Sequence, residues 1–218
     1  MEVSGAYTAD RAAALSGVPR STVHYWARKE ILVPSVSDER VKLWSYPDLF
    51  ALRTVYWLRR KKTDVTGHDV PATAMRQVRR ALAQLAELDL GLFHDGRPTV
   101  LVQLDGEVLV HPPGDAPRSL DGQLVARELL DVIAPFETRE RTHGVDLQQP
   151  SAFVCILPRK LSGSPHVVGT RIDTQGLAAL QRRGFDPKGI VRLYPDLTEA
   201  QVADALRVEE LLAQNLAA

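Results

Sequence analysis

Cysteine is almost absent from this sequence, and metal-binding motifs are missing with it. The 218 residues include one cysteine, Cys155, which excludes an internal disulfide and any metal site built from several cysteines. Cys155 lies in the apolar run 153–157, so we expect a buried structural thiol. The histidines at His94, His111 and His143 do not have the spacing of a ligand motif. We therefore expect no metal and no cofactor.

Long apolar runs and enzyme motifs are missing as well. No apolar stretch approaches the ~18 residues that cross a bilayer, and residues 1–4 do not begin a signal peptide. We therefore expect a cytoplasmic protein without a membrane partner. There is no nucleophile elbow, phosphate-binding loop or useful carboxylate pair, which indicates a protein that is not an enzyme.

The chain has no net charge, but its charges are unevenly distributed. It contains 27 Lys and Arg against 27 Asp and Glu. Residues 1–62 hold eleven basic and six acidic residues, a net of +5, so the remainder carries −5. A basic N-terminal segment favours binding to a polyanion, because phosphate contacts release counterions.

Residues 8–32 contain two short helical patterns that meet at a corner. Gly17 can adopt the positive φ angle of a tight corner, and Pro19 suits the first turn of the next helix. Val23 and Trp26 are placed to face inward from that second helix. The pattern is typical of a helix-turn-helix, and the alternative is an ordinary helical hairpin with a solvated outer face.

The outer face of the second helix is polar and basic. Its candidates for contacts with phosphates and base edges are Arg20, Ser21, Thr22, His24, Tyr25, Arg28 and Lys29. The following residues, 33–44, predict a small hairpin that ends in an alternating run. A hairpin beside a helix-turn-helix adds phosphate contacts, so Arg40 and Lys42 are further candidates.

Several motifs of this N-terminal third occur together. They are Tyr25-Trp26, Arg28, Ile31-Leu32, Lys42-Leu43-Trp44-Ser45 and Asp48-Leu49. As a set they resemble the MerR-type winged helix-turn-helix, which implies binding to operator DNA. Glu30 stands where that family usually has Gly, and Lys42 where Arg is usual, which weakens a bidentate grip on phosphate. One winged domain covers a half-site, so we also expect a homodimer.

The middle of the chain predicts structure but no function. A helix is expected from Asp69 to about Leu90, pairing either with its copy in a dimer or within its own subunit. Residues 99–111 predict a hairpin around Asp105-Gly106, and residues 119–134 predict a helix.

The C-terminal third predicts three short helices with tight corners. They cover residues 174–183, residues 187–194 and a last helix behind a capping box at 198–201. Residues 162–218 hold six basic and seven acidic residues, which does not favour contact with DNA.

A second set of motifs lies in this C-terminal third. It consists of Gly163, Pro165, Gly169-Thr170-Arg171-Ile172, Gly184 and Tyr194-Pro195-Asp196-Leu197-Thr198. It resembles a small domain of formerly unknown function found in VapB-like antitoxins, which implies a PIN-like ribonuclease toxin as partner. The partner-binding candidates are Arg171, Tyr194, Arg207, Leu211, Leu212, Asn215 and Leu216. For the motif residues the alternative is a purely structural role.

The sequence thus predicts a mainly α fold with small β elements. Its expected parts are a winged helix-turn-helix at 1–66, a connecting helix with a β-hairpin and a further helix at 67–150, and a three-helix, helix-turn-helix-like domain at 151–218. The leading hypothesis is an antitoxin of a type II toxin–antitoxin system that represses its own operon. The alternative is a MerR-type regulator that responds to a small molecule. Truncation after Leu161 is expected to abolish toxin capture and to leave operator binding.

Overall fold

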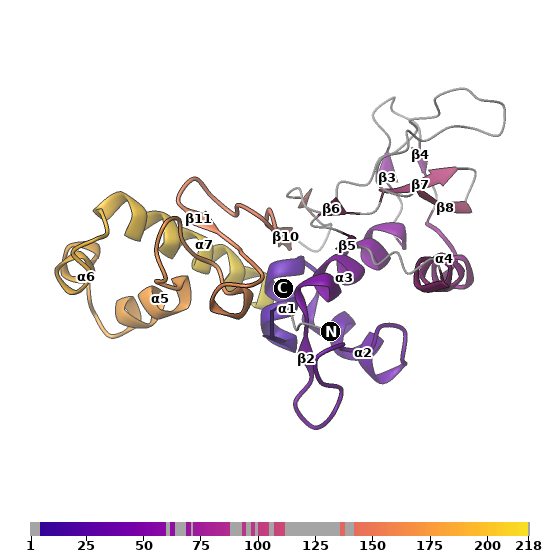
Figure 1. The fold of residues 1–218 in the computed structure, drawn as a ribbon, viewed down its shortest axis with the longest axis horizontal. Helices are drawn as coiled ribbons and strands as arrows, with labels where there is room; N and C mark the ends of the chain where they lie inside the picture. The colour runs from indigo at the N-terminus through magenta and orange to yellow at the C-terminus, as the bar shows by residue number, and fades with distance from the viewer. Residues whose placement is uncertain are drawn as a thin grey trace. The chain divides into compact units, whose positions relative to one another are not determined.

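The chain is mainly helical, with small antiparallel β elements, as the sequence predicted. The computed structural model describes residues 5–59, 62–63, 69–70, 72–87, 93–94, 97–98, 100–104, 107–111, 136–137 and 142–217. Over these residues it has seven α-helices and two-stranded antiparallel sheets (Figure 1). Contacts group residues 1–49 with residues 133–218 in a first compact unit and residues 50–132 in a second. The expected division into three consecutive domains stays a prediction.

The N-terminal part of the first unit is built on two short helices. Strand β1 (Tyr7–Thr8) leads into α1 (Ala9–Ser16), and α2 (Arg20–Arg28) follows after a short corner. Strand β2 (Leu43–Trp44) returns to pair with β1, with Tyr7 opposite Trp44 and Thr8 opposite Leu43. Helix α3 (Tyr46–Leu58) begins in this unit and continues into the second.

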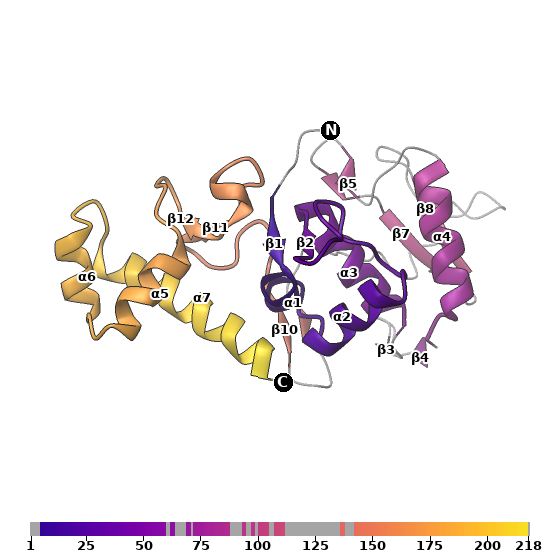
Figure 2. The same ribbon diagram turned by 90° about the horizontal axis from the view of Figure 1, so that it is seen from below.

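The C-terminal part of the first unit contributes three helices and two small sheets. The sheets pair β9 (Phe136–Glu137) with β10 (His143–Gly144) and β11 (Val154–Cys155) with β12 (His166–Val167), and a 3-10 turn lies at Leu161–Gly163. Helices α5 (Thr174–Arg182), α6 (Pro187–Leu193) and α7 (Glu199–Ala217) follow. Figure 2 shows α7 running from the α5–α6 pair to α1, against which it packs.

The three C-terminal helices begin at local caps, which is why the sequence located them. The Asp173 carboxylate accepts a bond from the Gly176 N–H at 2.7 Å, and Asp186 accepts one from the Gly189 N–H at 2.7 Å. At α7, Gln201 N–H donates to Thr198 Oγ1 at 3.2 Å, and Thr198 N–H donates to Gln201 Oε1 at 2.8 Å. This reciprocal pair confirms the predicted capping box.

The described residues of the second unit hold the greater part of α3, the whole of α4 and several short hairpins. Helix α4 (Met75–Glu87) packs against β8 (Glu107–His111), which pairs with β7 (Val100–Leu104) in the register Val100 to His111. The predicted strands at 99–111 are therefore confirmed, whereas the turn at 105–106 lies outside the described residues. The remaining strands are β3 (Lys62–Thr63), β4 (Asp69–Val70), β5 (Phe93–His94) and β6 (Arg97–Pro98).

The predicted helices of the middle of the chain and the predicted hairpin at 33–44 differ in their outcomes. The helix predicted from Asp69 begins only at Met75, because residues 69–70 form β4 and pair with Lys62–Thr63. The helix predicted at 119–134 lies outside the described residues. In the segment 33–44, strand β2 pairs with β1, and only an isolated bridge between Ser37 and Leu43 closes the loop. Leu43 exchanges backbone hydrogen bonds with Ser37, at 2.8 and 3.1 Å, so the predicted hairpin closes there, whereas the sequence did not predict the second pairing of β2 with β1.

Candidate nucleic-acid interface

Helix α2 has one buried and one exposed face. Val23 is fully buried, and Trp26 and Ala27 are buried beside it. The exposed predicted candidates are Arg20, Ser21, His24, Tyr25, Arg28 and Lys29, while Thr22 is half-buried. Arg20, His24 and Arg28 are four residues apart and therefore lie along one side of the helix. The structure thus brings the α2 candidates together on one surface.

The corner before α2 requires glycine for two reasons. Gly17 has φ +72°, in the left-handed region, and its N–H donates to Ala13 O at 2.9 Å to close α1. A Cβ at Gly17 would lie 2.6 Å from the Gly144 nitrogen, so a side chain cannot fit. Thr142 Oγ1 donates to the Gly17 carbonyl at 2.6 Å. Residues near β10 therefore fix the point from which α2 starts.

Helix α2 is followed by a residue in the left-handed region, Glu30. The Ile31 N–H donates to Trp26 O at 3.0 Å and the Glu30 N–H to Ala27 O at 3.3 Å, which is a Schellman motif. Such an ending places one residue in the left-handed region, and Glu30 has φ +51°. The backbone at Glu30 is thus one that favours glycine.

The loop between α2 and β2 is held at its base by Asp48. The Asp48 carboxylate accepts bonds from the backbone N–H groups of Ser35, at 3.0 Å, and Ser45, at 2.7 Å. Of the two loop candidates, Arg40 is exposed. Lys42 is half-buried and its Nζ donates to the Asp38 carbonyl at 2.7 Å. A phosphate would have to compete with that carbonyl for Lys42, whereas among the described residues Arg40 has no such hydrogen-bond partner.

One acidic side chain reaches the exposed face of α2. Asp10, in the first turn of α1, places Oδ1 2.6 Å from Arg20 Nε and 3.8 Å from His24 Nε2. The sequence did not mark Asp10 as a site residue, because acidic residues are common in the first turn of a helix.

Helix α1 is anchored on its other side by the C-terminal part of the same unit. Arg11 Nη1 and Nη2 donate to the two carboxylate oxygens of Glu209, at 2.9 and 2.6 Å. The Asn215 side chain donates to Ala14 O at 2.8 Å. Tyr7 Oη donates to Gly163 O at 2.7 Å, and burial, together with the neighbouring Tyr46, raises the pKa of this phenol well above its usual range, an effect that Arg11 partly opposes.

The predicted partner-binding residues divide by exposure. Arg171, Arg207 and Leu216 are exposed, and Tyr194 and Leu211 are half-buried. Leu212 and Asn215 are only 1% exposed, because they lie on the side of α7 that packs within the unit. These two side chains are therefore not available to a partner while α7 stays on α1.

Asp204 on α7 holds the segment before β11. Its carboxylate accepts bonds from Ser151 Oγ at 2.5 Å, the Phe153 N–H at 3.0 Å and Arg207 Nη2 at 2.6 Å. Burial raises the pKa of Asp204, but these hydrogen bonds and the Arg207 charge outweigh it and leave the pKa below its usual range. The contact of Arg207 with Asp204 gives this partner candidate a role within the fold.

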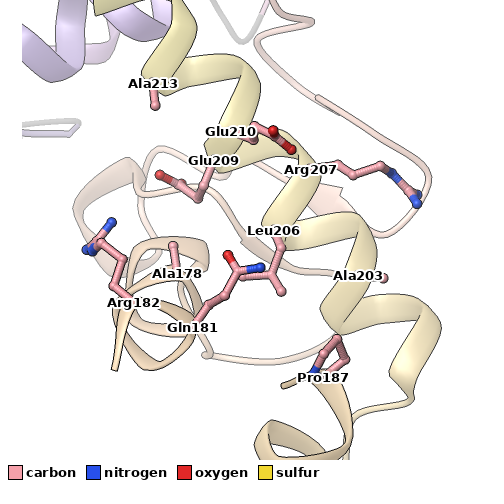
Figure 3. Close-up of a pocket in the computed structure, with 10 residues that line it drawn as sticks. All are labelled: Ala178, Gln181, Arg182, Pro187, Ala203, Leu206, Arg207, Glu209, Glu210 and Ala213. Carbon is pink, nitrogen blue, oxygen red and sulfur yellow. The ribbon is translucent and has the colours of Figure 1, made fainter. Parts of the chain in front are cut away.

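A pocket of about 470 Å³ opens between α5 and α7 beside the start of α6 (Figure 3). Its apolar lining comes from Ala178, Pro187, Ala203, Leu206 and Ala213. Its polar lining comes from Gln181, Arg182, Arg207, Glu209 and Glu210. Figure 3 shows Arg207 extending away from Arg182. The small apolar residues leave room for an inserted side chain.

The single cysteine is half-buried rather than buried, which corrects the sequence expectation. Cys155 lies opposite His166 in the β11–β12 pair, and its Sγ is 3.4 Å from His166 Nε2. The other ring nitrogen of His166 lies 2.9 Å from the Ser164 carbonyl. Burial raises the pKa of the Cys155 thiol more than the Lys160 charge lowers it, so the group favours the neutral thiol.

Neither metal ligands nor membrane helices emerge from the described residues. Nowhere in that part of the chain do three or more His, Cys, Asp or Glu side chains gather as a metal site would require. Within the same ranges, every helix is too short or too polar to cross a bilayer.

The described residues form a mainly helical fold in which α2 has an exposed, polar and basic face. Residues 154–207 match a family model described as Protein of unknown function (DUF433). A relative from Xylella fastidiosa (strain 9a5c), 4-hydroxythreonine-4-phosphate dehydrogenase, is 30% identical over 171 residues. These residues are 78% of this chain but 46% of that protein, so the chain spans less than half of this relative. No solved structure matches the chain.

The family match coincides with the second set of sequence motifs. The range 154–207 contains all the residues that carried the resemblance to an antitoxin-associated domain, from Gly163 to Thr198. The family description names no function. The relative's name describes the relative, and the expectation that this chain is not an enzyme stays a prediction.

Proposed function

We propose that this chain is an antitoxin that binds operator DNA through α1, α2 and the loop 33–44, acting as a winged helix-turn-helix. The observation that carries the DNA-binding part is the exposed polar face of α2 opposite the buried Val23 and Trp26. The major groove of B-DNA, about 12 Å wide, admits a helix of this kind. Arg20 and His24 would then face the groove along one side of α2.

The local charges support this assignment. The segment 1–62 carries a net +5, while the remainder of the chain carries −5. Exposed Arg28 and Lys29 at the end of α2, together with Arg40 in the loop, are placed for phosphates on either side of the groove. The acidic remainder of the chain limits binding to DNA by its other surfaces.

The DNA-binding proposal is tested with Arg20→Ala/Arg28→Ala in the full chain. Binding to the DNA upstream of its own gene is measured by fluorescence anisotropy over a series of salt concentrations. Loss of each phosphate contact lowers the slope of log K against log salt by about 0.9. The matched control is Arg192→Ala with Arg183→Ala, which removes one arginine from α6 and one at the end of α5. Equal slopes and affinities for both double variants would contradict the assignment to α2.

The antitoxin part of the proposal is supported by the motifs within residues 154–207. There the resemblance to VapB-like antitoxins implies a PIN-like ribonuclease as partner. The pocket beside α5 and α7, with small apolar residues and a polar rim, is suited to a protruding side chain of such a partner. Dehydrogenase activity is not carried over from the relative, because the chain spans only 46% of it.

Co-expression tests the antitoxin assignment directly. The gene next to this one is inspected for a small protein with three or four spaced acidic residues and is expressed with the full chain. Co-purification and loss of ribonuclease activity are the expected results. Arg171→Ala/Leu216→Ala should reduce capture, whereas Arg20→Ala/Arg28→Ala should retain it. A neighbouring transporter or metabolic enzyme, with no ribonuclease captured, would instead favour a regulator that responds to a small molecule.

A further inference from the structure

Asp10 contacts the guanidinium group of Arg20 at its Nε atom. An arginine side chain has five N–H donors, one on Nε and four on the two Nη atoms. Asp10 Oδ1 lies 2.6 Å from Nε, at the side of the guanidinium group nearest the α2 backbone. No second ion pair of Arg20 occurs within the described part of the first unit. The two Nη atoms, at the far end of the side chain, are therefore left for a ligand.

That arrangement matches the geometry of guanine recognition. Guanine presents two acceptors, O6 and N7, to the major groove, and the most common specific contact to them is a bidentate arginine. Such a contact uses two donors in one plane, so its strength depends on how well the guanidinium plane is fixed. An ion pair at Nε draws the guanidinium group toward α1 without occupying the far end of the side chain.

We propose that Asp10 is a positioning residue that holds Arg20 for a guanine in the major groove. This inference rests on the proposed DNA-binding function and deepens it, because it assigns a preferred base to one position of α2. Asp10 also lies 3.8 Å from His24 Nε2, one helical turn further along the same side of α2. Its negative charge lowers the affinity of this surface for phosphate on any sequence. Asp10 therefore raises sequence discrimination while it lowers non-specific affinity.

A role of Asp10 as a negative charge alone predicts a different effect on base preference. If Asp10 acted only by its charge, its removal would raise affinity for all duplexes alike and leave base preference unchanged. If it positions Arg20, Asp10→Asn lowers the preference for guanine at one base pair. Arg20→Lys lowers the same preference, since a lysine has a point charge and no planar pair of donors. The two changes then act on one interaction, and the double variant loses no more than Arg20→Lys alone.

The experiment selects binding sites from a library of randomised duplexes. The full-length wild type, Asp10→Asn, Arg20→Lys and the double variant are compared, and Asp196→Asn, at an exposed position outside the proposed DNA-binding surface, serves as the control for the loss of one negative charge in the same unit. We expect Asp10→Asn to lower guanine preference at one position about five- to ten-fold, and Arg20→Lys about ten-fold or more at the same position. We expect Asp196→Asn to leave base preferences unchanged.

The outcomes separate this inference from the function on which it rests. If the wild type selects a motif and Asp10→Asn selects it with the same guanine preference, the positioning role is overturned. Additive losses from Asp10→Asn and Arg20→Lys would overturn it as well. If the wild type selects no motif and binds no duplex even at low salt, the DNA-binding proposal itself fails. Tryptophan fluorescence of each variant confirms that it is folded, since Trp26 and Trp44 are buried in the first unit.

Discussion

The ion pair between Arg11 and Glu209 provides a quantitative test of how the first unit is held together. Two charge-assisted bonds, of 2.9 and 2.6 Å, join residues that are 198 positions apart, and each side chain is 12% exposed. The Thr174 hydroxyl at the start of α5 also donates to Glu209 Oε1. Glu209→Gln removes the negative charge but keeps an oxygen that can accept a bond from Thr174.

The size of the effect follows from the burial of the pair. Exposed ion pairs contribute up to about 1 kcal/mol, and removing one partner of a fully buried pair costs about 3–5 kcal/mol. The Arg11–Glu209 pair lies between these limits, and glutamine retains part of the hydrogen bonding. We therefore expect Glu209→Gln to lower the free energy of unfolding by about 2 kcal/mol, taking a value between the two limits.

Urea unfolding followed by tryptophan fluorescence measures this loss. A Trp57→Phe background confines the signal to Trp26 and Trp44, which are buried in the first unit. A loss of about 2 kcal/mol lowers the unfolding midpoint by roughly 1 M urea. Glu210→Gln is the matched control, because Glu210 is the exposed neighbour on the same helix. Midpoints of Glu209→Gln and Glu210→Gln that agree within error would refute the reasoning.

Three further variants test local features of the same unit. Glu30→Gly should raise the unfolding free energy by about 1 kcal/mol, because φ +51° strains any residue except glycine, and an unchanged urea midpoint would contradict this. Gly17→Ala should lower it by about 2 kcal/mol or more, since the new Cβ meets Gly144, and it should also weaken DNA binding by displacing α2. The lowered pKa of Asp204 means that its stabilising effect is present above the ordinary aspartate pKa of about 3.9 and is lost as pH falls through its lower folded pKa. Ser151→Ala removes one bond that lowers this pKa, so acid unfolding should move to higher pH; a shift to lower pH would count against the assignment.

The features that the sequence predicted best are those with local causes. The three C-terminal helices begin at Asp173, Asp186 and the Thr198–Gln201 box, and each cap is formed by residues three positions apart. The inward positions Val23 and Trp26 follow from helical periodicity in the same way. Such patterns lie within one turn of a helix, so a single sequence contains all the information that they need.

The features that the sequence did not predict depend on distant partners. Strand β2 had the alternation of a hairpin strand, but its partner β1 lies more than thirty residues earlier. The start expected for α4 was wrong for a similar reason, because residues 69–70 pair with β3 instead of continuing the helix. At the candidate site, the pairing of Asp10 with Arg20 depends on the angle at which α1 meets α2, which no residue pattern specifies.

The position of α1 also changes how the two proposed activities can be separated. One side of α1 packs against α2, while the other contacts α7 through Arg11 and through the Ala14 carbonyl. Truncation after Leu161 would remove Glu209 and Asn215, and with them the partners of both groups. The Ala14 carbonyl and Arg11 would then lack these partners. Their loss would destabilise α1, against which α2 packs. Loss of DNA binding in that truncation would therefore report on folding, contrary to the sequence expectation that operator binding is retained. Point variants on exposed positions, Arg20 and Arg28 on one side and Arg171 and Leu216 on the other, leave α1 and α7 in contact and so separate the two activities.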